Sequence, residues 1–167
     1  MSMEITNTGA EELQPKAVDA AIQKQLDTLQ NSEPLTYVVE DDKANNFLCK
    51  MTLDEVGITN VSAFLRAELA LADLKNLLEA KQEFPSLILL DINMPAMDGW
   101  AFLNEFRNFP EVARLKTSIY LFSTSDHPND IAKKDLYPEV LDFVAKPLSE
   151  EVAITLKEKY LRPRIAA

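Results

Sequence analysis

Several apolar runs in this chain end in a side chain that can do chemistry. Asp91 follows the run 87–90 and precedes a loop that contains Pro95. The side chains that follow the other runs are Glu40, Asp41 and Asp42 after 35–39, Ser123 after 119–122, and Lys146 after 141–145. Short apolar runs that stop abruptly are typical of strands buried on both faces. Because the carboxyl ends of parallel strands meet at one edge of a sheet, we expect these acids, the hydroxyl and the ammonium to lie together.

A group of carboxylates such as this one calls for a cation. Each carboxylate raises the pKa of its neighbours unless a positive charge neutralises them. Mg2+ is a hard ion that is usually held by a few carboxylates, with positions left open for water and phosphate oxygens. The pattern therefore predicts Mg2+ as the cofactor at this edge of the sheet.

The elements that position these residues follow from periodicity and turn signals. From residue 35 onward, apolar runs alternate with helical patterns, which favours an α/β fold with a parallel sheet and crossover helices on both faces. The expected helices cover 44–56, capped by Gly57, then 68–81, a third that starts near Asp98, a short one near 128–130, and a last one over 149–160. The run 61–65 is a weaker second strand.

An extra amphipathic helix is predicted before the first strand, because Val18, Ile22, Leu26 and Leu29 recur at helical spacing after Pro15. We expect an N-terminal extension over 1–33, one domain over 34–162 and a tail over 163–167 without an output domain. The helix either packs on its own domain or contacts a partner, so a homodimer stays open.

Composition limits the possible functions. The 167 residues allow one ordinary domain, and a formal net charge of -10 with a pI near 4.6 argues against a nucleic-acid surface. No apolar stretch reaches the roughly 20 residues of a membrane span, and no signal peptide is visible, so a cytoplasmic location is expected. The single cysteine, Cys49, is interpreted as a packing residue, and the single histidine, His127, as a solvated loop residue.

The motif Asp91-x-x-Met-Pro-x-Met-Asp-Gly, with the acids upstream and Ser123 and Lys146-Pro147 downstream, resembles the receiver domain of two-component response regulators. The resemblance covers about residues 35–160. It implies the flavodoxin-like, doubly wound five-stranded sheet with strand order 2-1-3-4-5. It also implies a phosphoprotein of a phosphorelay that acts through an unknown protein target, and not an enzyme beyond slow self-dephosphorylation.

The resemblance also implies a role for each site residue. Asp91 is the phosphoacceptor, which takes a phosphoryl group from a sensor histidine kinase or a histidine phosphotransfer protein. Mg2+ is held by Asp41, Glu40, Asp91 and the backbone carbonyl of Asn93. The remaining assignments are phosphoryl contact by Lys146 and Ser123, an aromatic switch at Phe143 where the family more often has Tyr, and tuning of dephosphorylation by Asn93 and Ser125. The peptide bond before Pro147 is often cis in the family.

Alternatives stay open at this point. Asp42 is either a secondary acid of the site or the N-cap of the helix that follows, and we favour the cap. The chain could be a binding module with a receiver fold that signals without phosphate, although such modules usually lack one of the site residues retained here. A Mg2+-dependent phosphohydrolase that forms an aspartyl phosphate is disfavoured, because Asn93 stands where those enzymes need a second acid.

Overall fold

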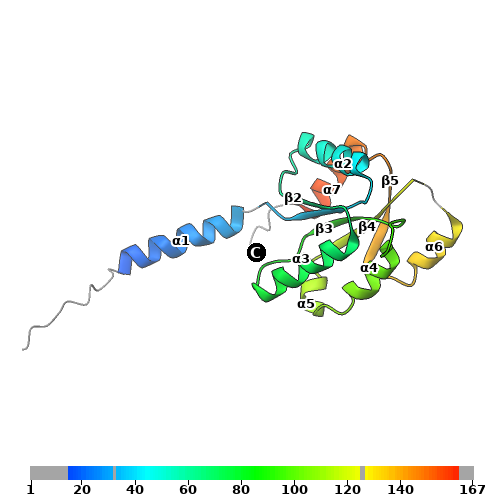
Figure 1. Cartoon of the computed structure of the whole chain (residues 1–167). Coiled ribbons are helices and arrows are strands. Elements are labelled where there is room, and N and C mark those ends of the chain that lie inside the picture. The colour runs from blue at the N-terminus through cyan, green and yellow to red at the C-terminus, as the bar shows by residue number, and fades with distance from the viewer. Residues whose placement is uncertain (1–14, 32, 125–126, 162–167) are drawn as a thin grey trace, which may run out of the picture. The chain divides into compact units, whose positions relative to one another are not determined.

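The computed structural model describes residues 15–31, 33–124 and 127–161 of the chain. Its five strands form one sheet in the order β2-β1-β3-β4-β5, and every neighbouring pair is parallel (Figure 1). The strands are β1 (Thr36–Val39), β2 (Val61–Phe64), β3 (Leu87–Asp91), β4 (Ser118–Ser123) and β5 (Val140–Ala145). The predicted doubly wound sheet and its strand order are confirmed.

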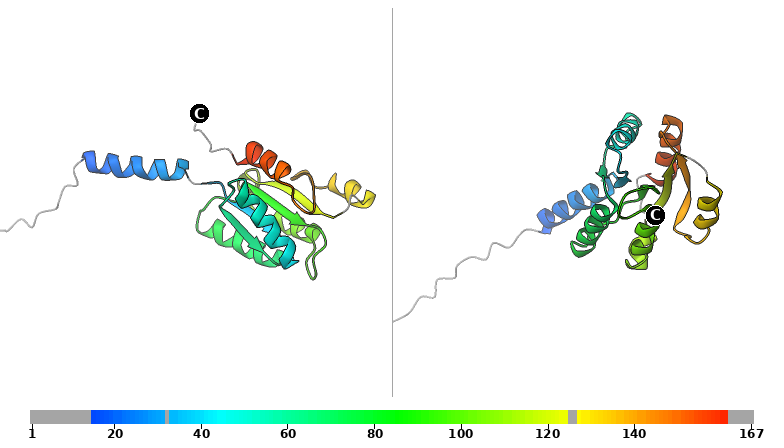
Figure 2. Two further views of the ribbon diagram at one scale, coloured as in Figure 1. Left: turned by 90° about the horizontal axis from the view of Figure 1, so that it is seen from above. Right: turned by 45° about the vertical axis from the view of Figure 1, so that its right-hand side comes forward.

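Helices cover both faces of this sheet (Figure 2). On one face lie α2 (Lys43–Glu55) and α7 (Glu150–Tyr160), which bury Leu53 and Leu156 with β-strand residues such as Leu89. On the other face lie α3 (Ala67–Glu79) and α4 (Gly99–Phe106), which contribute Leu74 and Phe106 to a larger, aromatic-rich core. The remaining helices of this unit are α5 (Glu111–Arg114) and α6 (Pro128–Lys134).

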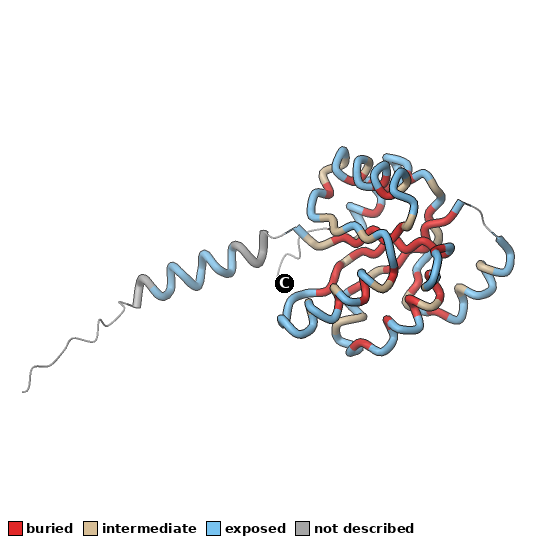
Figure 3. The backbone as a smooth tube through the Cα atoms, viewed as in Figure 1, coloured by how far each residue is buried: buried red, intermediate tan, exposed pale blue. Residues whose placement is uncertain are grey.

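The strands β1 and β3 are buried along their whole length, and Figure 3 shows the buried backbone of the sheet in red. All residues of β1 and β3 are buried, whereas β2 and β5 are the edge strands and are partly exposed. Strands that are covered by helices on both faces read as continuous apolar runs, which is why the sequence identified β1 and β3 directly.

Helix ends mostly follow the predicted signals. Asp98 caps α4, with its side chain accepting a hydrogen bond from the Ala101 amide at 2.8 Å. Gly57 has φ of 77° and follows the last turn of α2, as predicted for a C-terminal cap. The predicted helix 68–81 ends earlier, because Lys81 has a left-handed φ of 55°. The single turn α5 was not predicted.

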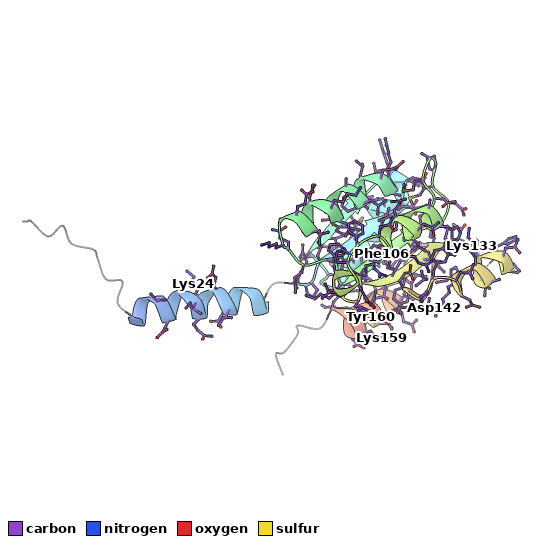
Figure 4. All side chains as sticks on the ribbon, turned by 90° about the horizontal axis from the view of Figure 1, so that it is seen from below. Lys24, Phe106, Lys133, Asp142, Lys159 and Tyr160 are labelled. Carbon is purple, nitrogen blue, oxygen red and sulfur yellow. The ribbon has the colours of Figure 1, made fainter. Side chains whose placement is uncertain are left out.

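A polar and aromatic cluster connects α6 to α4. No residue of α6 is buried, but Lys133 Nζ lies 4.8 Å from the centroid of the Trp100 ring on α4. Behind α6, the guanidinium of Arg107 lies 4.4 Å from the Tyr137 ring centroid, and its Nε donates to Glu139 Oε1 at 2.7 Å. Figure 4 labels Lys133 on α6 and Phe106, a core residue of α4. The cation–π contact of Lys133 with Trp100 therefore links α6 to α4, and the Arg107 contacts hold the segment that follows α6.

The N-terminal helix α1 (Pro15–Asn31) belongs to a separate unit from residues 33–162. Val18, Ile22 and Leu26 repeat every fourth residue along it, and Gln23 Nε2 donates to Asp27 Oδ1 at 2.9 Å. The predicted N-terminal helix is thus present. No helix within residues 15–31, 33–124 and 127–161 is long and apolar enough to cross a membrane.

Candidate functional site

The carboxyl ends of the strands bring the predicted acids together. Glu40 and Asp41 directly follow β1, and Asp91 is the last residue of the neighbouring strand β3. Carboxylate oxygens of these three residues all lie within 4.8 Å of one another. Glu40 is 1% exposed and Asp91 is 4% exposed, whereas Asp41 is half-buried. Two of the three negative charges are therefore almost fully shielded from water.

Lys146 brings a positive charge into this group from the end of β5. Its Nζ forms ion pairs with the Glu40 carboxylate and, at 3.1 Å, with Asp91 Oδ1. Its backbone amide donates to the carbonyl of Ser123 at 2.8 Å, and the peptide bond between Lys146 and Pro147 is cis. Burial lowers the pKa of Lys146, but the contacts with Glu40 and Asp91 outweigh burial and raise that pKa. The ammonium therefore stays charged.

The charge of Asp91 is still strongly disfavoured in this setting. Burial, followed by the negative charge of Glu40, raises the pKa of Asp91 to about 6 from an ordinary value of 3.8. Lys146 and the amide of Asn93, which donates to Asp91 Oδ1 at 3.1 Å, offset only part of this effect. The single positive charge of Lys146 does not balance the negative charges of the carboxylates, so a further cation would be electrostatically favourable here.

The donor set fits a magnesium ion. The oxygens of Glu40, Asp41 and Asp91 are hard ligands, and a few carboxylates with space for water or phosphate oxygens form the usual protein site for Mg2+. Asn93 is exposed in the loop after β3, where its backbone carbonyl is a further candidate ligand. These residues would hold the ion, and its positive charge would offset the burial and the negative charge of Glu40 that raise the pKa of Asp91.

The backbone behind Asp91 is tightly packed. The Gly99 amide donates to the carbonyl of Ile92 at 2.9 Å, so the first turn of α4 lies directly against the end of β3. A Cβ atom at Gly99 would stand 2.6 Å from the Asp91 carbonyl oxygen, which is closer than any real Cβ contact. Ala96 in the same loop has a left-handed φ of 65°. This loop therefore needs glycine at 99 and is strained at 96.

Asp42 points to the helix rather than to the other acids. Its Oδ1 accepts a hydrogen bond from the Asn45 amide at 2.9 Å and caps α2. Its own amide donates to Glu40 Oε1 at 3.0 Å, so it supports the site through its backbone.

Of the remaining predicted site residues, Ser123 lies at the carboxyl end of the strands, Phe143 lies within β5, and Ser125 is outside the described part. Ser123 is buried at the end of β4, next to β3 and β5. Phe143 is half-buried on the edge strand β5 and packs against the aromatic-rich core. Ser125 lies outside the described residues. His127, predicted in a loop, is exposed and caps α6 by accepting from the Asn129 amide.

One buried polar residue was missed. Asn46 on α2 is 6% exposed, and its Nδ2 donates to the carbonyl oxygens of Glu40, at 3.1 Å, and Phe64, at 3.3 Å. The signal was present in the sequence: Asn46 shares the buried stripe of α2 with Cys49 and Leu53, at spacings of three and four residues. A polar residue on an apolar stripe needs buried partners.

Comparison with known proteins gives one consistent picture. Residues 36–156 match the family model described as the response regulator receiver domain. A curated relative, the probable methanogenesis regulatory protein FilR2 of Methanothrix harundinacea, is 27% identical over 135 residues, which are 79% of this chain and 85% of that protein. Two other curated relatives are much longer, and the match spans 24% of one and 16% of the other.

Solved structures agree with this match. A two-component response regulator from Cytophaga hutchinsonii superposes with a TM-score of 0.68 at 27% identity, over 78% of this chain and 98% of that one. The Mn2+-bound form of response regulator Rcp1 superposes with a TM-score of 0.61 at 26% identity, over 77% of this chain and 95% of that one.

Proposed function

This chain belongs to the response regulator receiver family, and we propose from that premise that it accepts a phosphoryl group on Asp91 and signals through protein contacts. The observation that carries the proposal is the position of the Asp91 carboxylate: at the end of β3, within reach of two more acids and ion-paired with Lys146. A buried acid that served only the packing of the core would not need two further carboxylates and an ammonium beside it.

The proposed reaction is an in-line displacement at phosphorus. A carboxylate oxygen of Asp91 forms a new bond to the phosphoryl phosphorus as the bond from phosphorus to the donor breaks, and the donor leaves with its electron pair. A carboxylate is a weak nucleophile, so positioning and charge neutralisation carry most of the catalysis. Mg2+, when bound by Glu40, Asp41, Asp91 and the Asn93 carbonyl, supplies positive charge for the phosphoryl oxygens.

The side chains around Asp91 have separate tasks in this proposal. Lys146, already 3.1 Å from Asp91 Oδ1, pairs with a phosphoryl oxygen. The Ser123 hydroxyl donates a hydrogen bond to the phosphoryl group on Asp91, and the half-buried ring of Phe143 turns inward behind it. Phenylalanine has no hydroxyl to offer a partner, so the switch here acts by burying a ring. Asn93 and Ser125 tune the rate at which the acyl phosphate is hydrolysed.

We propose that the donor is a phosphohistidine of a sensor histidine kinase or of a histidine phosphotransfer protein. Support comes from the family and from the surface beside the site. Phe47, Leu48 and Met51 on α2 are 62%, 49% and 43% exposed, and they lie within the first three turns after the Asp42 cap. An exposed apolar face on the helix that Asp42 caps suits a docking protein better than a small donor.

Phosphorylation by acetyl phosphate tests the proposal directly. The protein is incubated with and without Mg2+, and intact mass is measured for wild type, Asp91→Asn and the control Asp54→Asn, which changes an exposed acid of α2. We expect one phosphoryl group on wild type and on the control, dependent on Mg2+, and none on Asp91→Asn. A folded wild type that stays unmodified in Mg2+ would instead favour the binding module that signals without phosphate.

We also propose residues 34–162 as the receiver and residues 1–33 as an extension whose amphipathic helix is a candidate for self-association. Solution mass with and without residues 1–32 tests this role. Glu33 is retained in this comparison because its carboxylate accepts hydrogen bonds from Thr59 and Asn60. A dimer that becomes a monomer after truncation supports the assignment, and an unchanged mass contradicts it.

A further inference from the structure

Asn46 ties together the ends of two neighbouring strands. Its Nδ2 donates to the carbonyl oxygens of Glu40 and Phe64, which end the ladder between β1 and β2. Both partners are carbonyl oxygens, which only accept, so the amide nitrogen of Asn46 must face them. The residue is 6% exposed, and a buried amide without such partners would be unfavourable.

The hydrogen bond from Asn46 to the Glu40 carbonyl takes the place of a backbone hydrogen bond that β2 does not supply. The Glu40 amide donates to the Phe64 carbonyl at 3.0 Å, which is the last backbone hydrogen bond from β1 to β2. The strand β2 ends at Phe64, so it offers no further amide to the Glu40 carbonyl. The Asn46 side chain donates to that carbonyl instead. Its two bonds therefore extend the pairing of β1 and β2 by one residue through a side chain.

This contact fixes the start of the turn at residues 40–42, which carries the acids Glu40, Asp41 and Asp42. The Glu40 carbonyl and the Asp41 amide belong to one planar peptide group, so holding the oxygen also holds the direction in which Asp41 leaves the strand. Two further hydrogen bonds hold the other side of the turn. The Asp42 amide donates to Glu40 Oε1 at 3.0 Å, and the Asn46 amide donates to the Asp42 carbonyl at 2.9 Å. Asn46 thus contacts the turn with both its backbone and its side chain.

We propose that Asn46 is a positioning residue for the metal site: it sets the spacing of the Glu40 and Asp41 carboxylates without touching the ion. This inference rests on the proposed function, because it assumes that Glu40 and Asp41 bind Mg2+. Groups that orient metal ligands in this way typically change metal affinity by about 10- to 100-fold when removed. The effect is on the affinity for the ion and not on the chemistry at Asp91.

The test compares Mg2+ affinity in variants of one helix. Asn46→Leu keeps a similar volume but removes both donors, and Asn46→Ala removes them while leaving space for water. Leu53→Ala is the matched control, because Leu53 is fully buried on the same helix but packs in the core away from the acids. Isothermal titration calorimetry with Mg2+ alone gives the Kd, and urea unfolding identifies the variants and conditions in which the protein is folded.

We expect the Kd for Mg2+ to rise about 10-fold or more in both Asn46 variants and to stay within twofold of wild type in Leu53→Ala. Phosphorylation by acetyl phosphate should be slow in the Asn46 variants at low Mg2+ and recover at saturating Mg2+. If either folded Asn46 variant binds Mg2+ like wild type, or if Leu53→Ala weakens binding equally, the inference is wrong. A wild type that binds no Mg2+ refutes the metal site itself, whereas one that binds Mg2+ but takes no phosphoryl group refutes only the proposed function.

Discussion

The negative charge of Asp91 destabilises the metal-free protein at neutral pH, so Asp91→Asn is expected to raise its free energy of unfolding. Burial and the charge of Glu40 raise the pKa of Asp91 to about 6 in the folded state, from an ordinary value of 3.8. The folded state therefore binds this proton more tightly than the unfolded state does. Stability is greatest while Asp91 is protonated and declines as the pH rises from about 4 to about 6.

The size of the effect follows from these two pKa values. Complete ionisation of Asp91 lowers the free energy of unfolding by about 3 kcal/mol relative to the protonated form. About half of that loss is already present at pH 5, because the unfolded carboxyl is then ionised while the folded one is mostly protonated. Between pH 5 and pH 8, the stability advantage of Asp91→Asn over wild type should therefore grow by about 1 to 2 kcal/mol.

Urea unfolding in a chelating buffer measures this difference. Wild type and Asp91→Asn are unfolded at pH 5, 6.5 and 8, with Asp54→Asn, which changes an exposed acid of α2, as the matched control. Added Mg2+ should favour wild type, since the proposed ion site includes the Asp91 carboxylate and Asp91→Asn lacks it. A difference between Asp91→Asn and wild type that is flat, or that shrinks as the pH rises, would refute this account of the buried charge.

Three further predictions concern the backbone around the site. Gly99→Ala should lower the free energy of unfolding by about 2 kcal/mol and slow phosphorylation, because the new Cβ meets the Asp91 carbonyl. Urea unfolding measures the first effect and labelling by acetyl phosphate the second. Unchanged values would contradict the close contact. Ala96→Gly should raise the free energy of unfolding by about 1 kcal/mol, since glycine adopts the left-handed φ of 65° without strain; a loss of stability would argue against that conformation. Asp42→Ala should lower it by about 1 kcal/mol through loss of the cap on the Asn45 amide, with the Kd for Mg2+ nearly unchanged; a large change in Kd would assign Asp42 to the metal site.

Much of the fold was predictable because the buried strands carry strong signals. The run of β3 is apolar up to Asp91 and that of β1 contains one polar residue, Thr36; turns follow both directly, so their ends could be placed within a residue. Once the strands are parallel, their carboxyl ends must meet, which brings Glu40, Asp41, Asp91 and Lys146 together without any knowledge of distances. The juxtaposition of the acids and the ammonium is thus a consequence of topology.

Other features depend on three-dimensional detail that a linear pattern does not contain. The role of Asn46 requires β2 to end at Phe64, and strand ends are the least certain part of any pattern. Ala96 has a left-handed φ although its residue type favours the right-handed region, so nothing in its identity marks the strain. The raised pKa of Asp91 depends on how deeply Glu40 and Asp91 are buried, which only the packed helices determine.

The contact between Lys133 and Trp100 gives the protein a built-in optical probe. Trp100 is the single tryptophan of the chain, so selectively excited emission comes from one known place. Trp100 follows Gly99, whose amide donates to the Ile92 carbonyl just after Asp91, and the Lys133 ammonium lies 4.8 Å from the centroid of its ring. Tryptophan emission is sensitive to such a nearby charge, so movement of α6 relative to α4 can be followed in solution without attaching a dye.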